Sequence, residues 1–531
     1  MRTRSVKAIV ALLCVVALAH GSVPFMQDIG GSLAFQGQDI VGGAAVIFKA
    51  PKRLRDITGG AAAVMKRPAR TTSRPTTQVA RNNGTPRPPT QPTATATPTD
   101  RAEDLAAAGD TYITSGRYAE AATAYEKVVR LEPDNAAAYS NLGYAYDKLG
   151  KVNESITALN TSVRLNPDDV IAFNNLGASF YKAGRYQEAM AAFRTAVRLD
   201  PNDHDALNNL GAAQYALELY EPAVQNFQKA IAAKSDSADA QYNFGNALYM
   251  TGRHREAAAA YRRAIELKRD YVEAHTNLGS LLIALGDLRS AISELQESIR
   301  LRAGNPVAHN NLGYAYVKLG ETLDRAAANQ YLQQAIAAYQ EALRLKPDYV
   351  KAQNNLGAAY NKLNQYQEAL GVLQRATRAK PDFPEAHYNL GTALYNLGRF
   401  KEAVAEFQQT VRLKIDHADA YNSLGTALYK DQQFETAIDA YKKALVLKPA
   451  NAETNNNLGT VYFRTKRYKE AATAFKEAIR LKPDYGEAHF NLALTYIALN
   501  DRKAALDQYN RLKKVDPKLA DDFFQRYIKA K

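Results

Sequence analysis

A glycine-centred motif, most often Asn-Leu-Gly, recurs along this chain with a spacing of 34 residues that is broken once by a step of 44. The glycines are Gly109, Gly143, Gly177, Gly211, Gly245, Gly279, Gly313, Gly357, Gly391, Gly425 and Gly459, and Ala493 takes the twelfth place. A fixed period of this length indicates an array of one small supersecondary unit rather than a single globular core. Function is therefore to be sought on the surfaces of the array.

The pattern inside one repeat predicts two helices. In the third repeat, Phe173, Leu176 and Phe180 are spaced as one stripe of a helix. Gly184 follows where a left-handed C-terminal cap is expected, and Pro201 ends the second helix of the pair. The capping glycine is predicted in seven repeats, with asparagine in two more: Gly116, Gly150, Gly184, Gly252, Gly286, Gly320 and Gly398, then Asn364 and Asn500.

This pattern resembles the tetratricopeptide repeat family across residues 102–519, in twelve units. Positions are counted from the first residue of a repeat, which is Val170 in the third repeat. That repeat has the family's residues at the eight diagnostic positions: Phe173 (position 4), Leu176 (7), Gly177 (8), Phe180 (11), Ala189 (20), Phe193 (24), Ala196 (27) and Pro201 (32). The resemblance implies an all-α fold, a right-handed α-solenoid or superhelix, closed by a capping helix at 520–531. The extra ten residues of repeat seven fall between its helices, at about 321–332, as a turn insertion or as an early start of the second helix that could serve in docking.

The segment before the array has a different character. Residues 1–21 have the basic, apolar and small-residue parts of a signal peptide, with Ala19 near the cleavage site and an uncleaved anchor as the alternative. Residues 22–67 are glycine-rich and basic, with short apolar runs compatible with small strands, and 68–101 form a Pro/Thr-rich linker that is predicted to be disordered. The protein is therefore expected to be exported to the periplasm, the cell envelope or the medium.

Charge is concentrated in the same segment. Residues 1–101 carry 14 Lys/Arg against 4 Asp/Glu, which leaves the array nearly balanced at 54 against 50. A balanced array gives no reason to expect nucleic acid as a partner. The basic arm could instead associate with a membrane or cell wall. The single cysteine, Cys14, lies inside the predicted signal peptide, so no disulfide is expected.

Ten of the twelve repeats have asparagine at position 6, which in the resembled family faces the concave surface. These residues are Asn141, Asn175, Asn209, Asn243, Asn277, Asn311, Asn355, Asn389, Asn457 and Asn491, and they are called the asparagine ladder below. A carboxamide both donates and accepts hydrogen bonds, so a row of them could hold a peptide backbone. Similar ladders in O-linked N-acetylglucosamine transferases are implicated in gripping extended substrates. The alternative is that asparagine is only the family's common residue here.

Position 13 adds cations to the same face, which favours acidic peptide segments. The candidates are Lys148, Lys182, Lys318, Lys362 and Lys430, with Arg464 as a sixth cation. A solvated helix end is the alternative explanation for lysine there. The carboxylate clamp of chaperone-binding members needs a basic residue at position 2, and only Lys351 with Asn355 fits, so that specific activity is not expected.

No motif of an enzyme is found: the chain has no phosphate loop, no metalloprotease motif and no dinucleotide fingerprint. No catalytic residue, cofactor or metal is predicted. Histidines recur at position 4 (His275, His309, His387 and His489), but this position usually holds a bulky core residue. Packed histidines are therefore expected rather than metal ligands.

The sequence as a whole predicts an exported, non-enzymatic scaffold or adaptor that binds extended peptide segments. Two alternatives stay open. One is a substrate-recognition subunit of a glycosyltransferase-type system, with catalysis on a partner chain. The other is a structural protein of the cell envelope.

Overall fold

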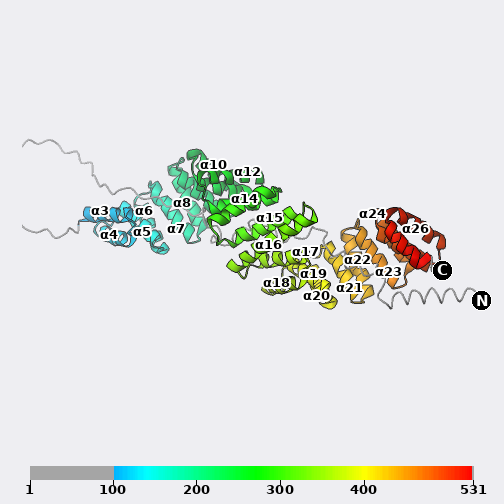
Figure 1. The fold of residues 1–531 in the computed structure, drawn as a ribbon. Helices are drawn as coiled ribbons and strands as arrows, with labels where there is room; N and C mark the ends of the chain where they lie inside the picture. Colours follow the sequence, from blue (N-terminus) through cyan, green and yellow to red (C-terminus); the bar gives the residue numbers. More distant parts are fainter. Residues whose placement is uncertain (1–100, 529–531) are drawn as a thin grey trace, which may run out of the picture. The chain divides into compact units, whose positions relative to one another are not determined.

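The structure, a computed structural model, describes residues 101–528. The predicted signal peptide, the 22–67 segment and the linker up to residue 100 lie outside the described residues. Within 101–528 the chain forms α-helices joined by turns, with one π-helical turn near the end and no strand. The predicted all-α solenoid of tetratricopeptide helix pairs is confirmed in this part of the chain (Figure 1).

The described residues divide into two compact units, one ending at Ala303 and one beginning at Gly304. We call them the N-terminal unit (101–303) and the C-terminal unit (304–528). The N-terminal unit consists of α3 (Ala102–Thr114), α4 (Tyr118–Leu131), α5 (Ala136–Lys148), α6 (Val152–Leu165), α7 (Val170–Lys182), α8 (Tyr186–Leu199), α9 (His204–Ala216), α10 (Tyr220–Ala233), α11 (Ala238–Met250), α12 (His254–Leu267), α13 (Val272–Leu285) and α14 (Leu288–Leu301).

Each repeat consists of a first and a second helix, so from α3 to α26 the odd-numbered helices are first helices and the even-numbered helices are second helices. The C-terminal unit continues this alternation. It consists of α15 (Pro306–Gly320), α16 (Arg325–Leu345), α17 (Val350–Lys362), α18 (Tyr366–Ala379), α19 (Pro384–Asn396), α20 (Phe400–Leu413), α21 (Ala418–Lys430), α22 (Phe434–Leu447), α23 (Ala452–Arg464), α24 (Tyr468–Leu481), α25 (Gly486–Ala498), α26 (Arg502–Val515), α27 (Pro517–Phe523) and the π-helical turn η4 (Phe524–Ile528). None of the helices between residues 101 and 528 combines the length and apolarity of a bilayer span.

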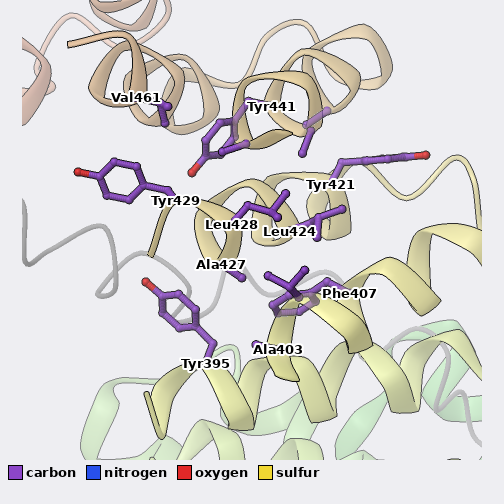
Figure 2. Close-up of a cluster of buried hydrophobic side chains, with 14 of the residues drawn as sticks. Tyr395, Ala403, Phe407, Tyr421, Leu424, Ala427, Leu428, Tyr429, Tyr441 and Val461 are labelled. Carbon is purple, nitrogen blue, oxygen red and sulfur yellow. The ribbon is translucent and has the colours of Figure 1, made fainter. Parts of the chain in front are cut away.

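The recurring glycine is required because the two helices of a pair approach closely at position 8. A Cβ atom built at Gly177 would lie 2.6 Å from the ring of Phe193, and one at Gly357 would lie 2.3 Å from Cγ of Leu373. The large residue opposite the glycine is fully buried in most repeats, as Phe193 and Phe407 are. Figure 2 shows Phe407 of α20 meeting Leu424 and Ala427 of α21, so the same ring also packs against the next repeat.

The left-handed caps follow the sequence prediction only in part. Six of the seven predicted glycines have a positive φ, as do Asn364 and Asn500. The prediction for Gly320 is wrong, because the insertion that follows lets α15 continue through Gly320 as its last helical residue. Three repeats instead place Glu218, Gln432 and Lys466 in the left-handed region, at φ angles of 62°, 62° and 63°. Helix packing therefore imposes the left-handed turn conformation even where a residue other than glycine must adopt it at a cost in backbone energy.

The insertion of repeat seven lengthens a helix. The second helix of this repeat, α16, has 21 residues where the other second helices have 14. It begins at Arg325, and Asp324 caps it by accepting hydrogen bonds from the backbone N–H groups of Ala326 and Ala327, each at 2.9 Å. The rings of Tyr316 and Tyr331 lie 5.9 Å apart and connect the extension to α15. Only residues 321–324 form the connection between the two helices.

The last repeat is covered by the end of the chain. Phe523 of α27 is fully buried and packs edge-on against Phe490 of α25, with ring centroids 5.1 Å apart. Tyr527 adds a further edge contact to Phe490 at 6.2 Å. These aromatic side chains occupy the apolar face that a following repeat would otherwise cover.

Candidate peptide-binding surface

The candidate residues lie on the first helices, which form the inner side of each unit. In the N-terminal unit α5, α7, α9 and α11 touch one another in turn, and in the C-terminal unit α15, α17, α19, α21, α23 and α25 do the same. Consecutive second helices make no comparable contact within residues 101–528. A stack whose first helices lie closer together than its second helices curves with the first helices inside. We call this side of each unit its inner surface.

The asparagine ladder is mostly buried. Seven of its members are at most 3% exposed: Asn141, Asn175, Asn209, Asn243, Asn311, Asn355 and Asn457. The other three are half-buried: Asn277, Asn389 and Asn491. The expectation that all ten amides are exposed on the inner surface is therefore wrong for seven of them, because neighbouring first helices pack over this position.

The buried amides connect one repeat to the next. Asn209 donates from Nδ2 to Oδ1 of Asn174 at 2.9 Å, and Asn355 donates in the same way to Asn310 at 3.0 Å. Each acceptor is the position-5 residue of the preceding repeat. The pairs with this geometry are Asn209–Asn174, Asn243–Asn208, Asn355–Asn310, Asn389–Asn354, Asn457–Asn422 and Asn491–Asn456. The ladder therefore has a structural role between repeats, while peptide binding by its members stays a prediction.

The signal for this role is present in the sequence as a second asparagine at position 5. Every repeat with asparagine at position 5 is followed by one with asparagine at position 6, at a separation of 35 residues outside the insertion. Where position 5 differs, the amide finds another partner. Asn277 donates to Oη of Tyr242 at 2.9 Å, and Asn141 donates to Oη of Tyr125 at 2.9 Å.

The position-13 lysines have different surroundings. Lys148 is exposed and its Nζ lies 5.2 Å from the ring centroid of Tyr144. Lys182 is paired with Asp147, whose side chain is fully buried. Lys318 and Lys362 both pair with Glu321, at 2.9 and 2.5 Å. Lys430 is half-buried. The cationic character predicted for the inner surface is therefore offset in part by carboxylates of the same chain.

Three of the four position-4 histidines are buried, and His309 is half-buried. His275, His387 and His489 are between 3% and 8% exposed. In the first two, Nδ1 contacts a glutamate of the second helix at 2.6 Å, Glu294 and Glu406 respectively. In the third the partner is the neutral Gln508, at 2.9 Å. Each Nε2 faces a backbone carbonyl six residues earlier.

The contacts of His275 predict a pH dependence. Burial disfavours the charged imidazole, but the hydrogen bonds to Glu294 and to the Arg269 carbonyl, with the charges of Glu294 and Glu297, outweigh burial and raise the pKa of His275 above its ordinary 6.5. A raised folded-state pKa contributes stability that is complete below the unfolded-state pKa and is lost as pH rises through the raised value. Glu294→Gln should lower the pKa of His275 and reduce this contribution, because a neutral amide does not stabilise the charged imidazole as the carboxylate does. An NMR titration of His275 in both proteins checks this, and an unchanged pKa in the variant would contradict it.

One group of side chains within 101–528 has the donor atoms of a metal site. Asp203, His204 and Asp205 bring three ligand atoms within 4.8 Å of one another. However, Oδ1 of Asp203 already caps α9 by accepting from the N–H groups of Asp205 and Ala206, at 3.0 and 3.2 Å. Nε2 of His204 lies 3.0 Å from Oδ1 of Asp205. The local chain geometry accounts for this group without an ion.

Family models for tetratricopeptide repeats match most of the array. One, described as a TPR repeat, matches residues 109–150, 245–286, 279–320, 327–363 and 357–398. Two others, each described as a tetratricopeptide repeat, match 142–204 and 388–452, and 462–522. Among curated proteins, none matches the chain.

Several solved structures are similar to the chain at low identity. The Cut9–Hcn1 hetero-tetramer of the APC/C matches at 15% identity and a TM-score of 0.43, over 81% of this chain and 96% of that one. Yeast Tom70 matches at 17% identity and a TM-score of 0.33, over 79% and 98%. YrrB, described as a TPR protein with an unusual peptide-binding site, matches at 21% identity and a TM-score of 0.32, over 36% and 99%.

Proposed function

The chain belongs to the tetratricopeptide-repeat family, and on that premise we propose that it is a non-catalytic adaptor that binds extended segments of partner proteins. The observation that carries this proposal is the inner surface, where first helices of successive repeats lie side by side in each unit. A partner laid along that surface can contact several repeats in turn, which gives a large interface from a repeated element.

The charged residues of position 13 are the contacts that we assign to this surface, together with the half-buried amides of Asn277, Asn389 and Asn491. Lys148 is exposed and Lys430 half-buried, so both are placed to meet an acidic segment. The alternative of a glycosyltransferase-type recognition subunit rested on a row of available amides. Burial of seven of these amides leaves three that are half-buried, so fewer amides are accessible for such a role than the sequence suggests.

We also propose that the protein acts outside the cytoplasm. This rests on the basic start, the short apolar stretch and the small-residue cleavage site near Ala19 that together form the predicted signal peptide of residues 1–21. The basic arm would then be available to a membrane or cell wall. N-terminal sequencing of the mature protein tests this proposal. A sequence that begins after Ala19 would support it, and one that still begins at Met1 would contradict a cleaved signal.

The binding proposal is tested by charge reversal on the two sides of the array. Tagged residues 102–531 are used to recover partners from the native host, which are identified by mass spectrometry. The double variant Lys148→Glu/Lys430→Glu changes first helices, and Lys229→Glu/Lys401→Glu changes exposed lysines of the second helices α10 and α20 in the same two units. Partner recovery should fall several-fold in the first variant and stay near wild type in the second. Charge reversal at the interface slows association with an acidic partner, whereas the same change away from the interface does not. Equal recovery with both variants would contradict binding at the inner surface.

A further inference from the structure

Two of the candidate lysines share one carboxylate. Lys318 ends the inner face of α15 and Lys362 is the last residue of α17, so they come from position 13 of consecutive repeats. Nζ of Lys318 lies 2.9 Å from Oε2 of Glu321, and Nζ of Lys362 lies 2.5 Å from Oε1. Each oxygen of the carboxylate thus accepts from a different ammonium group. The ammonium groups of the two lysines are therefore spaced to bind the two oxygens of one carboxylate, and we call this pair the cradle.

The cradle and Glu321 are partly buried, and the three side chains carry two positive charges and one negative charge. The side chains of Lys318, Lys362 and Glu321 are 25%, 10% and 26% exposed. Burial lowers the pKa of Lys362, and Glu321 offsets part of this effect. Burial acts to raise the pKa of Glu321, but the hydrogen bonds and charges of the two lysines outweigh it and hold the pKa below its ordinary value. One anion between two cations leaves this group with a net positive charge.

The position of Glu321 in the chain differs from that of a fixed ion-pair partner. Asp147, which pairs with Lys182, belongs to helix α5 and its side chain is fully buried. Glu321 instead follows the last residue of α15 and begins the short connection of residues 321–324. Its partly exposed side chain can therefore leave the lysines by rotation, while its backbone N–H stays bonded to the carbonyl oxygen of Val317.

We propose that Lys318 and Lys362 form a binding site for a carboxylate of a partner peptide, and that Glu321 occupies this site as an internal competitor. The proposal rests on the adaptor function and deepens it, since it names the chemistry of the partner and a device that limits its affinity. An incoming carboxylate replaces Glu321 between the two ammonium groups. The carboxylate belongs either to an acidic side chain or to a C-terminus.

The test measures binding of fluorescent peptides to the full chain. The probes are an amidated Glu/Ser peptide, a Gln/Ser peptide with a free C-terminal carboxylate, and an amidated Gln/Ser peptide. Glu321→Gln should bind a carboxylate probe about tenfold more tightly than wild type, the size expected for a hydrogen bond to a charged group. The amidated Gln/Ser peptide should show no gain. Which of the two carboxylate probes gains then assigns the site to side chains or to chain ends.

Two further variants separate this site from general charge effects. Glu341→Gln removes the same charge from α16, where Glu341 pairs with Arg344 at the surface, and it should bind like wild type. Glu321→Gln combined with Lys362→Met should lose the gain. Equal gains with Glu321→Gln and Glu341→Gln, or no gain with a folded Glu321→Gln, would overturn the proposal. The ion pairs of Glu321 would then serve only to hold the connection of residues 321–324 against the first helices.

A last variant keeps the test decisive if Glu321→Gln does not fold. Lys318→Met leaves Lys362 and Glu321 as a pair without net charge, and it should bind the carboxylate probes more weakly than wild type. Unchanged binding would contradict the site. If recovery of a host partner depends on the inner surface but does not change with Glu321→Gln, this site alone is overturned. Absence of any partner that depends on the inner surface would overturn the adaptor function.

Discussion

Replacing Gly357 by valine is expected to destabilise the C-terminal unit by about 2–3 kcal/mol, the upper range for overpacking a core. A Cβ at Gly357 would lie 2.3 Å from Cγ and 2.6 Å from Cδ2 of Leu373, so α17 and α18 must separate to admit it. Leu373 is fully buried and cannot turn away. Urea unfolding of residues 102–531, followed by circular dichroism, measures the change.

Gly371 provides the matched control in the partner helix. A Cβ there meets nothing within 4 Å, and the residue lies inside α18. Gly371→Ala should therefore stabilise the protein by up to about 1 kcal/mol, the helix preference of alanine over glycine. Similar losses in both variants would contradict the account of position 8 as a point of close helix approach.

The second large effect is expected from the asparagine ladder. Asn355→Ala leaves Oδ1 of Asn310 without the hydrogen bond that Nδ2 of Asn355 donates at 3.0 Å. Both residues are at most 2% exposed, so the loss should cost about 1–3 kcal/mol, as is typical for an unsatisfied buried polar group. The double variant Asn310→Ala/Asn355→Ala should cost less than the sum of the two single changes, because each single change already loses the hydrogen bond that the two amides share.

An exposed asparagine of the same unit is the control for this cycle. Asn329 lies on the exposed surface of the α16 extension, and its replacement by alanine should change the free energy of unfolding by less than about 0.5 kcal/mol. If Asn355→Ala changed the free energy of unfolding as little as Asn329→Ala, the asparagine ladder would have no structural role. In that case its amides would again be candidates for peptide binding.

The sequence alone was sufficient for the fold because its main constraint is local and repeated. A glycine at position 8 and a large residue at position 24, such as Gly177 and Phe193, identify two helices in close contact within a single repeat. Twelve copies in register leave little freedom in the architecture. The early start of α16 also follows from local composition, since Ala326–Ala328 favour helix once Asp324 caps it.

The candidate site was less predictable because its side chains bond to residues of other repeats. The burial of Asn209 depends on Asn174, and the position-13 lysines are offset by Asp147 and Glu321, whose roles no single repeat reveals. Gly320 was misassigned for a similar reason, since the insertion after it replaces the usual turn. The division at residues 303/304 falls where Ala303 replaces the closing proline of a repeat, but Ser235, Arg269 and Ile415 replace the same proline without such a division.

The adaptor function is tested most directly by photo-crosslinking at defined positions. A photoreactive residue is placed in turn at Lys148 and Lys430 of the first helices and at Lys229 and Lys401 of the second helices. A partner recovered from the native host should crosslink at one or both of the first-helix positions and not at the second-helix positions. Crosslinking of that partner only at Lys229 or Lys401, or equally at all four positions, would contradict recognition by the inner surface.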